Sequence, residues 1–165
     1  MSGIPGSGKS TWIKNHKNYF SEDCGIISRD AVRFSIITNE DEYFSKENEV
    51  FAEFIRQIKE SLNENIDTVV DATHINIGSR AKLLRALGAS LKGVEINIIV
   101  INVSLGTALE QNSLREGRSL VPEGAVERMF DNFCMPSLEE GFDNIYIYEN
   151  ENGKAKYEII SKGVE

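Results

Sequence analysis

The chain has 165 residues, of which 41% are hydrophobic, and it carries a formal net charge of −8. This length and apolar content predict one domain with a sizeable core. The negative charge weighs against a broad nucleic-acid-binding surface, which needs clustered Lys and Arg, but it leaves room for a small basic pocket. Because the sequence has no apolar run of about 18 residues and no signal-peptide pattern, we expect no membrane segment and a cytoplasmic location.

The first motif has the spacing of a phosphate-binding loop: Gly3, four residues, and then Gly8-Lys9-Ser10. Glycines let consecutive N–H groups turn toward phosphate oxygens, and the helix that follows adds the positive end of its dipole. Lys9 is expected to reach the outer phosphates of ATP and Ser10 to bind Mg²⁺. The alternative is a glycine-rich turn that carries a lysine by chance. The predicted ATP-binding residues of the loop are Gly3, Pro5, Gly6, Ser7, Gly8, Lys9, Ser10 and Thr11.

Only Met1 and Ser2 precede Gly3. A parallel strand, which normally leads into such a loop, needs about five residues. Either the sheet lacks its usual central strand or the sequence is short at its start. We expect the natural gene to encode about five or more mostly apolar residues before Met1, which would then be an internal methionine.

Beyond the loop, β-rich apolar runs alternate with helical patterns. This alternation is typical of a doubly wound parallel sheet, a three-layer α/β/α fold. We predict helices at 11–18, 30–37, 45–65, 79–91, 105–115 and 126–133. We predict strands at 25–28, 68–71, 94–103 and 144–148, with an edge strand at 156–160 after the turn Asn152-Gly153. The sequence shows no internal repeat or linker, so we expect a single domain over residues 1–165.

The longest predicted helix, at 45–65, has a clear apolar face. Its apolar residues recur at helical spacing and are expected to face the core: Val50, Phe51, Phe54, Ile55, Ile58 and Leu62. The two cysteines, Cys24 and Cys134, lie beside apolar neighbours without metal-ligand spacing. We expect both to be buried free thiols.

Ligands of such sheets bind beyond the carboxyl ends of the strands, so the residues after each strand are candidates for the site. Asp30 and Arg33 follow the strand at 25–28 and are three residues apart. On one face of a helix start, the Asp30 carboxylate could accept the proton of an attacking hydroxyl and Arg33 could hold a phosphate. The alternative is that Asp30 caps a helix that begins at Ala31.

Asp71 ends the strand at 68–71. A nucleotide enzyme would use a carboxylate there to hold either the Mg²⁺ hydration shell or a substrate-binding arginine. His74 is a weaker candidate for a catalytic base, because loop histidines more often pack or hydrogen-bond. Arg80 is expected to make structural ion pairs. The segment 139–143 is expected to be only a turn.

Arg115 lies where a predicted helix runs out into a loop that contains Gly117 and Pro122. This composition predicts a lid over residues 115–122, whose arginine would neutralise charge on a transferring phosphoryl group. The alternative is that Arg115 stabilises the helix C-terminus as a cation.

Four segments together carry a family resemblance: Gly-Ile-Pro-Gly-Ser-Gly-Lys-Ser-Thr-Trp at 3–12, Ser-Arg-Asp-Ala-Val-Arg at 28–33, Asp-Ala-Thr-His-Ile-Asn at 71–76, and Gln-Asn-Ser-Leu-Arg with Leu-Val-Pro at 120–122. Over nearly the whole chain the sequence resembles the phage-type polynucleotide 5′-hydroxyl kinases and their P-loop kinase relatives. The resemblance implies ATP-dependent transfer of the γ-phosphoryl group to a DNA or RNA 5′-hydroxyl. It implies Asp30 as general base, Arg33 and Asp71 shaping the acceptor site, and Arg115 acting on the phosphates.

The sequence departs from this family in two ways. Gln111 stands where family members often have an arginine, so the missing charge is either absent or supplied by Arg118, which we include among the nucleotide-binding residues. No Asp-x-Asp phosphatase motif occurs, so the expected unit is the kinase module alone. Two other functions stay open: a kinase for a small hydroxylated molecule, such as a nucleoside, sugar or modified amino acid, and a non-catalytic ATP-binding module.

Overall fold

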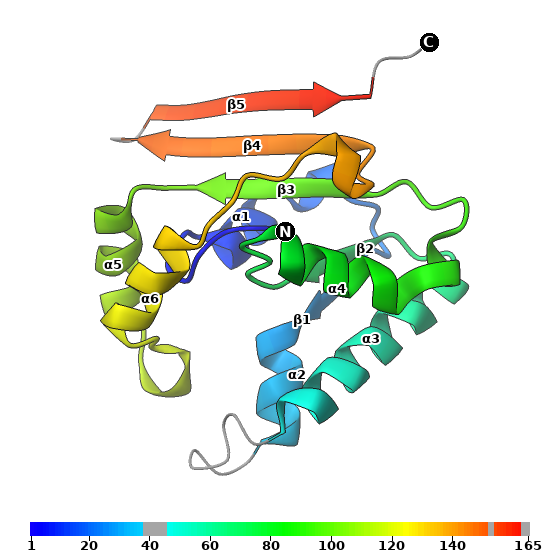
Figure 1. The fold of residues 1–165 in the computed structure, drawn as a ribbon, viewed down its shortest axis with the longest axis horizontal. Coiled ribbons are helices and arrows are strands. Elements are labelled where there is room, and N and C mark those ends of the chain that lie inside the picture. The colour runs from blue at the N-terminus through cyan, green and yellow to red at the C-terminus, as the bar shows by residue number, and fades with distance from the viewer. Residues whose placement is uncertain (38–45, 152–153, 163–165) are drawn as a thin grey trace.

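The computed structural model describes residues 1–37, 46–151 and 154–162, in which helices and strands alternate (Figure 1). Its α-helices are α1 Lys9–Asn15, α2 Arg29–Ile36, α3 Glu47–Asn63, α4 Ile77–Leu87, α5 Leu105–Ser113 and α6 Glu123–Asp131. Its strands are β1 Gly25–Ser28, β2 Thr68–Asp71, β3 Asn97–Asn102, β4 Asn144–Glu151 and β5 Lys154–Ser161. Short 3₁₀ turns are η1 Lys17–Tyr19, η3 Gly88–Leu91, η4 Gly117–Ser119 and η5 Leu138–Glu140.

The strands form two sheets that the first residues of the chain connect. β1 pairs with β2 in parallel, and β3 pairs with β4 in parallel, while β5 is antiparallel to β4. Ser2 bridges in parallel to Val100 of β3, and the Met1 nitrogen donates to the carbonyl of Val70 in β2 at 2.9 Å. The N-terminus therefore lies between the two sheets, as Figure 1 shows. The spatial order is β1, β2, residues 1–3, β3, β4, β5, which confirms the predicted α/β fold with a parallel sheet.

Helices cover both faces of this arrangement, which gives three layers. On one face α1 packs Trp12 and Ile13 against Met1, Val69 and Ile101. On the other face the cores are larger. One joins α2, α3 and α4 to β1 and β2, with these buried residues: Val32, Ile37, Val50, Phe54, Ile55, Ile58, Ala72 and Leu87. The predicted apolar face of α3 is confirmed, because four of its six residues are buried and the other two pack against the same core.

Element boundaries differ from the predictions by a few residues. α2 begins at Arg29 because the Ser28 hydroxyl accepts from the N–H of Ala31 and so caps the helix. The alternative that Asp30 is the cap is therefore wrong. The predicted start of the third helix at Ser45, and the predicted turn Asn152-Gly153, lie outside the described residues. Among the residues that the structure does describe, no helix is both long and apolar enough to cross a membrane.

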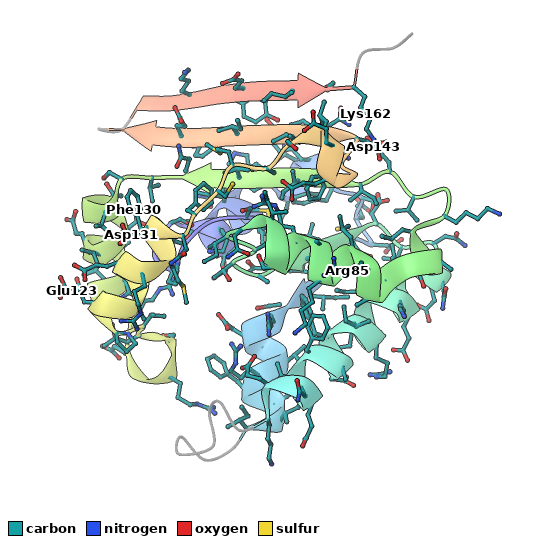
Figure 2. The ribbon with its side chains drawn as sticks, viewed as in Figure 1. Arg85, Glu123, Phe130, Asp131, Asp143 and Lys162 are labelled. Carbon is teal, nitrogen blue, oxygen red and sulfur yellow. The ribbon has the colours of Figure 1, made fainter. Side chains whose placement is uncertain are left out.

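The segment 139–143 is more than the turn that we expected. Glu140 forms a buried ion pair with Arg80 of α4, at 2.7 Å between Oε2 and Nε, and Phe142 belongs to the core between β3 and β4. Asp143 accepts from the N–H of Ile96 and from Lys162. Figure 2 shows the side chains of Asp143 and Lys162 together, where β4 begins and β5 ends. The expected structural ion pair of Arg80 is confirmed.

Both cysteines are free, as expected, but their burial differs from the prediction. Cys24 is half-buried, whereas Cys134 is exposed. The reason is local. The backbone of Cys134 is tied inward, since its N–H donates to Ile75 and its carbonyl accepts from Arg80, and this leaves the thiol on the solvent side.

Candidate active site

The loop at 3–8 is built so that only glycine fits at its turning points. Gly6 has φ 78°, and a Cβ added there would lie 2.1 Å from the carbonyl oxygen of Ala108 in α5. Gly8 has φ 90° and is the N-cap residue, directly before the first residue of α1. Because both positions lie in the left-handed region, a side chain would strain the loop or displace α5. The loop therefore keeps a fixed shape against α5, and its backbone N–H groups lead into the positive end of α1.

Lys9 is buried and folds back on the loop. Its ammonium donates to the carbonyls of Gly3 at 2.8 Å and Ile4 at 2.9 Å. Burial lowers the pKa of Lys9 to about 8; the carboxylates of Asp71 and Asp30 oppose this change, and Arg115 adds to it. Charges on β2, on α2 and on the segment after α5 therefore all act electrostatically on this one amine.

Ser10, which follows Lys9, contacts Asp71. The Ser10 hydroxyl donates to Oδ2 of Asp71 at 3.0 Å, which joins the first turn of α1 to the end of β2. Within the described residues, no group of three or more His, Cys, Asp or Glu side chains could hold a metal. Mg²⁺ typically keeps several waters and takes one or two protein ligands together with substrate phosphates, so a hydroxyl and a carboxylate at a phosphate loop fit this ion. Sequence reasoning named both residues but did not predict their contact.

Asp30 and Arg33 are brought together as the spacing predicted. Nη1 of Arg33 donates to Oδ1 of Asp30 at 2.6 Å. The Asp30 side chain is 68% exposed, whereas that of Arg33 is 12% exposed. Asp30 therefore presents a carboxylate to solvent from the first turn of α2, and Arg33 holds it from the next turn.

Glu47, at the start of α3, fixes two arginines of α2 and was missed by sequence reasoning. Its Oε1 accepts from Nε of Arg33 at 2.9 Å, and its Oε2 accepts from Nη2 of Arg29 at 2.9 Å. Arg29 also lies over the ring of Phe51, and Lys82 of α4 lies 4.3 Å from the same ring centroid. No local motif marks Glu47, so the sequence held no signal for this role.

The segment after α5 is closed at its base by Asn112, another residue that sequence reasoning missed. This side chain is buried; its Nδ2 donates to the carbonyl of Val121 at 2.7 Å, and its Oδ1 accepts from the N–H of Val121 at 3.3 Å. Arg115 lies inside the closed loop and donates to the carbonyl of Ser119 at 3.5 Å. The sequence signal that could have identified Asn112 is a polar residue on the inner face of the helix predicted at 105–115.

Arg118 contacts the C-terminal end of α2. Its Nη1 donates to the carbonyl of Ile37, the residue that ends α2, at 2.6 Å. Its guanidinium lies 4.7 Å from the ring centroid of Phe34. Arg118 thus connects the predicted lid to the helix that carries Asp30, and its role in nucleotide binding stays a prediction.

Comparison with known proteins agrees with this geometry. The sequence matches the AAA_33 family, described as an AAA domain, over residues 1–136. The chain belongs to this family. Among solved structures, the AAA domain is similar to a chain from a study of the PezAT chromosomal toxin–antitoxin system of Streptococcus pneumoniae. The match has a TM-score of 0.56 and 16% identity, and it covers 94% of this chain and 68% of that chain. At this identity the likeness concerns the fold.

His74 of this AAA domain is a structural residue. It is buried in the left-handed region, at φ 41°, and its Nδ1 is 3.1 Å from the carbonyl oxygen of Met1. Burial lowers the pKa of His74 to about 3, helped by the positive N-terminal amine and opposed by the bond to Met1. A ring that is neutral and enclosed at ordinary pH does not reach a substrate. This agrees with the expectation that a loop histidine more often packs or hydrogen-bonds than acts as a base.

Proposed function

We propose that the protein is an ATP-dependent kinase that transfers the γ-phosphoryl group of ATP to a polynucleotide 5′-hydroxyl. The observation that carries the proposal is that two pairs of side chains follow the strand ends: Ser10 with Asp71 beside Lys9, and Arg33 with an exposed Asp30, whose charge also acts on the Lys9 amine. One pair has the chemistry of an acceptor site and the other that of a donor site. Membership of the AAA domain family supports nucleotide use, and the resemblance of the segment at 28–33 to polynucleotide kinases supports the acceptor.

In this proposal the donor half consists of the loop Gly3–Thr11 and Asp71. Loop N–H groups bind the phosphates, and Lys9 exchanges its contacts with the Gly3 and Ile4 carbonyls for contacts with the outer phosphates. Ser10 and Asp71 would hold Mg²⁺, which when bound neutralises phosphate charge. The buried walls of the loop keep these donors oriented before the reaction begins.

In the acceptor half, Asp30 acts as general base. As the acceptor oxygen forms its bond to the γ-phosphorus, the bond from that phosphorus to the bridging oxygen of ADP breaks, and the hydroxyl proton passes to Asp30. Arg33 holds the carboxylate in its reactive position and presents positive charge to the acceptor, while Glu47 fixes Arg33 from behind. The carboxylates of Asp30 and Glu47 thus have separate tasks, since Asp30 accepts the proton and Glu47 fixes Arg33.

The lid is proposed to be residues 115–122 of a single kinase domain over 1–165. Arg115 would stabilise charge that develops on the transferring group, because its charge already acts at Lys9. Arg118 contacts α2 instead of the loop, so we propose that it holds the lid near the acceptor helix. The charge missing at Gln111 is then not replaced by Arg118 at the phosphates.

A small hydroxylated molecule is the second candidate acceptor. The specific observation in its favour is that Glu47 pairs with both Arg29 and Arg33, which reduces the positive charge offered to a polyanion. The overall charge of −8 acts in the same direction. A non-catalytic ATP-binding module has less support, because such a module needs no exposed carboxylate such as Asp30 at the start of α2.

The deciding experiment is transfer from γ-labelled ATP, tested in parallel against 5′-hydroxyl DNA, 5′-hydroxyl RNA and a panel of nucleosides. Oligonucleotides that already carry a 5′-phosphate are the matched control, because they lack only the accepting hydroxyl. Labelling of 5′-hydroxyl oligonucleotides alone supports the proposal. Labelling of nucleosides but not of oligonucleotides identifies a small-molecule kinase, and binding of ATP without transfer to any acceptor contradicts both kinase proposals.

A further inference from the structure

Strand β5 forms an open edge of the sheet. It pairs with β4 on one side, and Figure 1 shows it at the outer border of the sheet. Tyr157 is 51% exposed and Ile159 is 53% exposed, although both side chains are large and mainly apolar. A long edge strand with exposed apolar side chains is a template for pairing with another strand.

β5 lacks two features with which proteins usually protect such an edge. It contains no proline, and its eight residues pair with β4 in one unbroken register without a bulge. Charged side chains are the remaining protection, and here they have both signs. Lys156 and Glu158 are two residues apart and therefore lie on the same face of the strand. Such a pair favours a partner strand that carries the opposite charges at the opposing positions.

The register of β5 shows which of its backbone groups face outward. In an antiparallel pair, residues that exchange hydrogen bonds alternate with residues that do not. Lys162, directly after β5, donates its N–H across this ladder to the carbonyl of Asp143 at 3.2 Å. The even-numbered residues of β5 therefore bond to β4. The outward N–H and C=O groups belong to the odd-numbered residues, which include Tyr157, Ile159 and Ser161.

Self-pairing of β5 has one register that suits its charges. A two-fold symmetric antiparallel pair places one residue opposite its own copy, and only centres at residues 156–159 pair five or more residues of β5. Centres at 156 and 158 place Lys156 or Glu158 opposite itself, and a centre at 159 places Lys156 opposite Lys162. A centre at Tyr157 places Lys156 opposite Glu158 on both sides of the axis, at closely spaced positions without hydrogen bonds.

The centre of this register is aromatic. Tyr157 would face its own copy, and within each chain it already stacks on Tyr146 of β4, with 6.1 Å between the ring centroids. Aromatic pairs on neighbouring strands stabilise a sheet. The register thus combines apolar contacts at the axis with opposite charges beside it.

We propose that β5 pairs antiparallel with β5 of a second copy of this chain, with Tyr157 on the two-fold axis. The proposal is independent of the catalytic function. The pairing joins one sheet of each copy into a continuous sheet, and it places the outward N–H and C=O groups of β5 in hydrogen bonds.

The test measures the monomer–dimer equilibrium of the 165-residue chain by sedimentation. Glu158→Lys replaces both attractive pairs with like-charge pairs and should raise the dissociation constant at least about tenfold, and Lys156→Glu should do the same. The double variant restores opposite charges in the same register, so its dissociation constant should return to within about threefold of the original. Glu127→Lys, at an exposed position of α6, is the matched control because it changes the net charge equally.

Amide exchange localises the interface in the unaltered chain, so this measurement does not depend on a variant that folds. At concentrations that favour the dimer, the Tyr157 and Ile159 amides should exchange at least about tenfold more slowly than in the monomer. The Ile160 amide, which bonds to β4, should not change. The proposal is overturned by a chain that stays monomeric at every concentration, by equal responses to Glu158→Lys and Glu127→Lys, or by a double variant that does not recover dimerisation.

Discussion

The hydroxyl of Ser10 and the carboxylate of Asp71 are hydrogen-bonded at 3.0 Å, although 61 positions separate them in the sequence. This contact connects the start of α1 to the end of β2 at the mouth of the phosphate loop. Both atoms are oxygen ligands of the kind that Mg²⁺ prefers.

If this pair holds Mg²⁺, Asp71→Asn is expected to raise the Mg²⁺ concentration for half-maximal activity by at least about tenfold, because an amide is a weaker ligand than a carboxylate. Asp67→Asn, at the other end of the same strand, is the matched control and should leave the Mg²⁺ titration unchanged. Equal titrations for the two variants would remove Asp71 from the metal site.

Asp30→Asn is expected to lower kcat by about 100-fold or more, because the amide cannot take the proton of the acceptor hydroxyl. ATP affinity, measured by calorimetry, should change less than twofold, since the phosphate loop is built from other residues. Asp131→Asn, an exposed carboxylate on α6 that Figure 2 labels, is the control. A parallel loss of ATP binding and turnover in Asp30→Asn would contradict the role of a base.

The two lid arginines are expected to differ. Arg115→Ala should lower kcat by more than about tenfold through lost stabilisation of the transition state. Arg118→Ala should instead detach the lid from α2, which limited proteolysis would detect as faster cleavage within 115–122. Phe34→Leu keeps an apolar side chain but removes the cation–π contact, so it should give a smaller effect of the same kind. Identical kinetics for both arginine variants would reject this division.

Acid is expected to destabilise the fold through His74. The unfolded chain binds a proton near the ordinary pKa of 6.5, whereas the buried ring binds one only near pH 3. The unfolded state therefore binds more protons between these values, and the free energy of unfolding falls as pH drops from 6.5 to 3, by roughly 5 kcal/mol in total. Urea unfolding across this range measures it. His74→Asn, which tolerates the left-handed backbone, should flatten the dependence, and an unchanged slope would assign the effect to other groups.

Arg80→Met should destabilise the protein by about 3–5 kcal/mol, because it leaves Glu140 as an unpaired, largely buried charge. The double variant Arg80→Met with Glu140→Gln should recover part of that loss. Chemical denaturation of both variants and of the wild type gives the comparison. If the double variant is less stable than Arg80→Met, the bond that the Ser137 N–H donates to the Glu140 carboxylate outweighs the ion pair.

The local patterns of the sequence predicted most of the fold. The apolar face of α3 and the strand that ends at Asp71 could be found because helical and strand periodicities are local properties. The phosphate-loop motif selected Ser10, and the rule that sites form beyond strand ends selected Asp30 and Asp71, of which Asp71 contacts Ser10 in the structure. Their catalytic roles stay predictions.

Contacts between distant segments could not be predicted in the same way. Arg118 bonds to Ile37 across 81 positions, and nothing near Arg118 in the sequence points to that carbonyl. The helix cap was ambiguous because Ser28 and Asp30 both have capping side chains, and only backbone geometry selected Ser28. Cys134 was misjudged because apolar neighbours in sequence did not enclose its thiol in space.

The side-chain amide of Asn112 bonds to the backbone of Val121 and so joins the segments that lead into and out of the predicted lid. With its base fixed at Asn112 and Val121, the predicted lid could move at residues 115–120 without displacing α5 or α6. α5 forms the wall against Gly6, so a lid hinged on α5 itself would deform the phosphate cradle with every opening. If the predicted lid moves, Asn112 would separate these two motions, so that one face of the proposed site could move while the other keeps its shape.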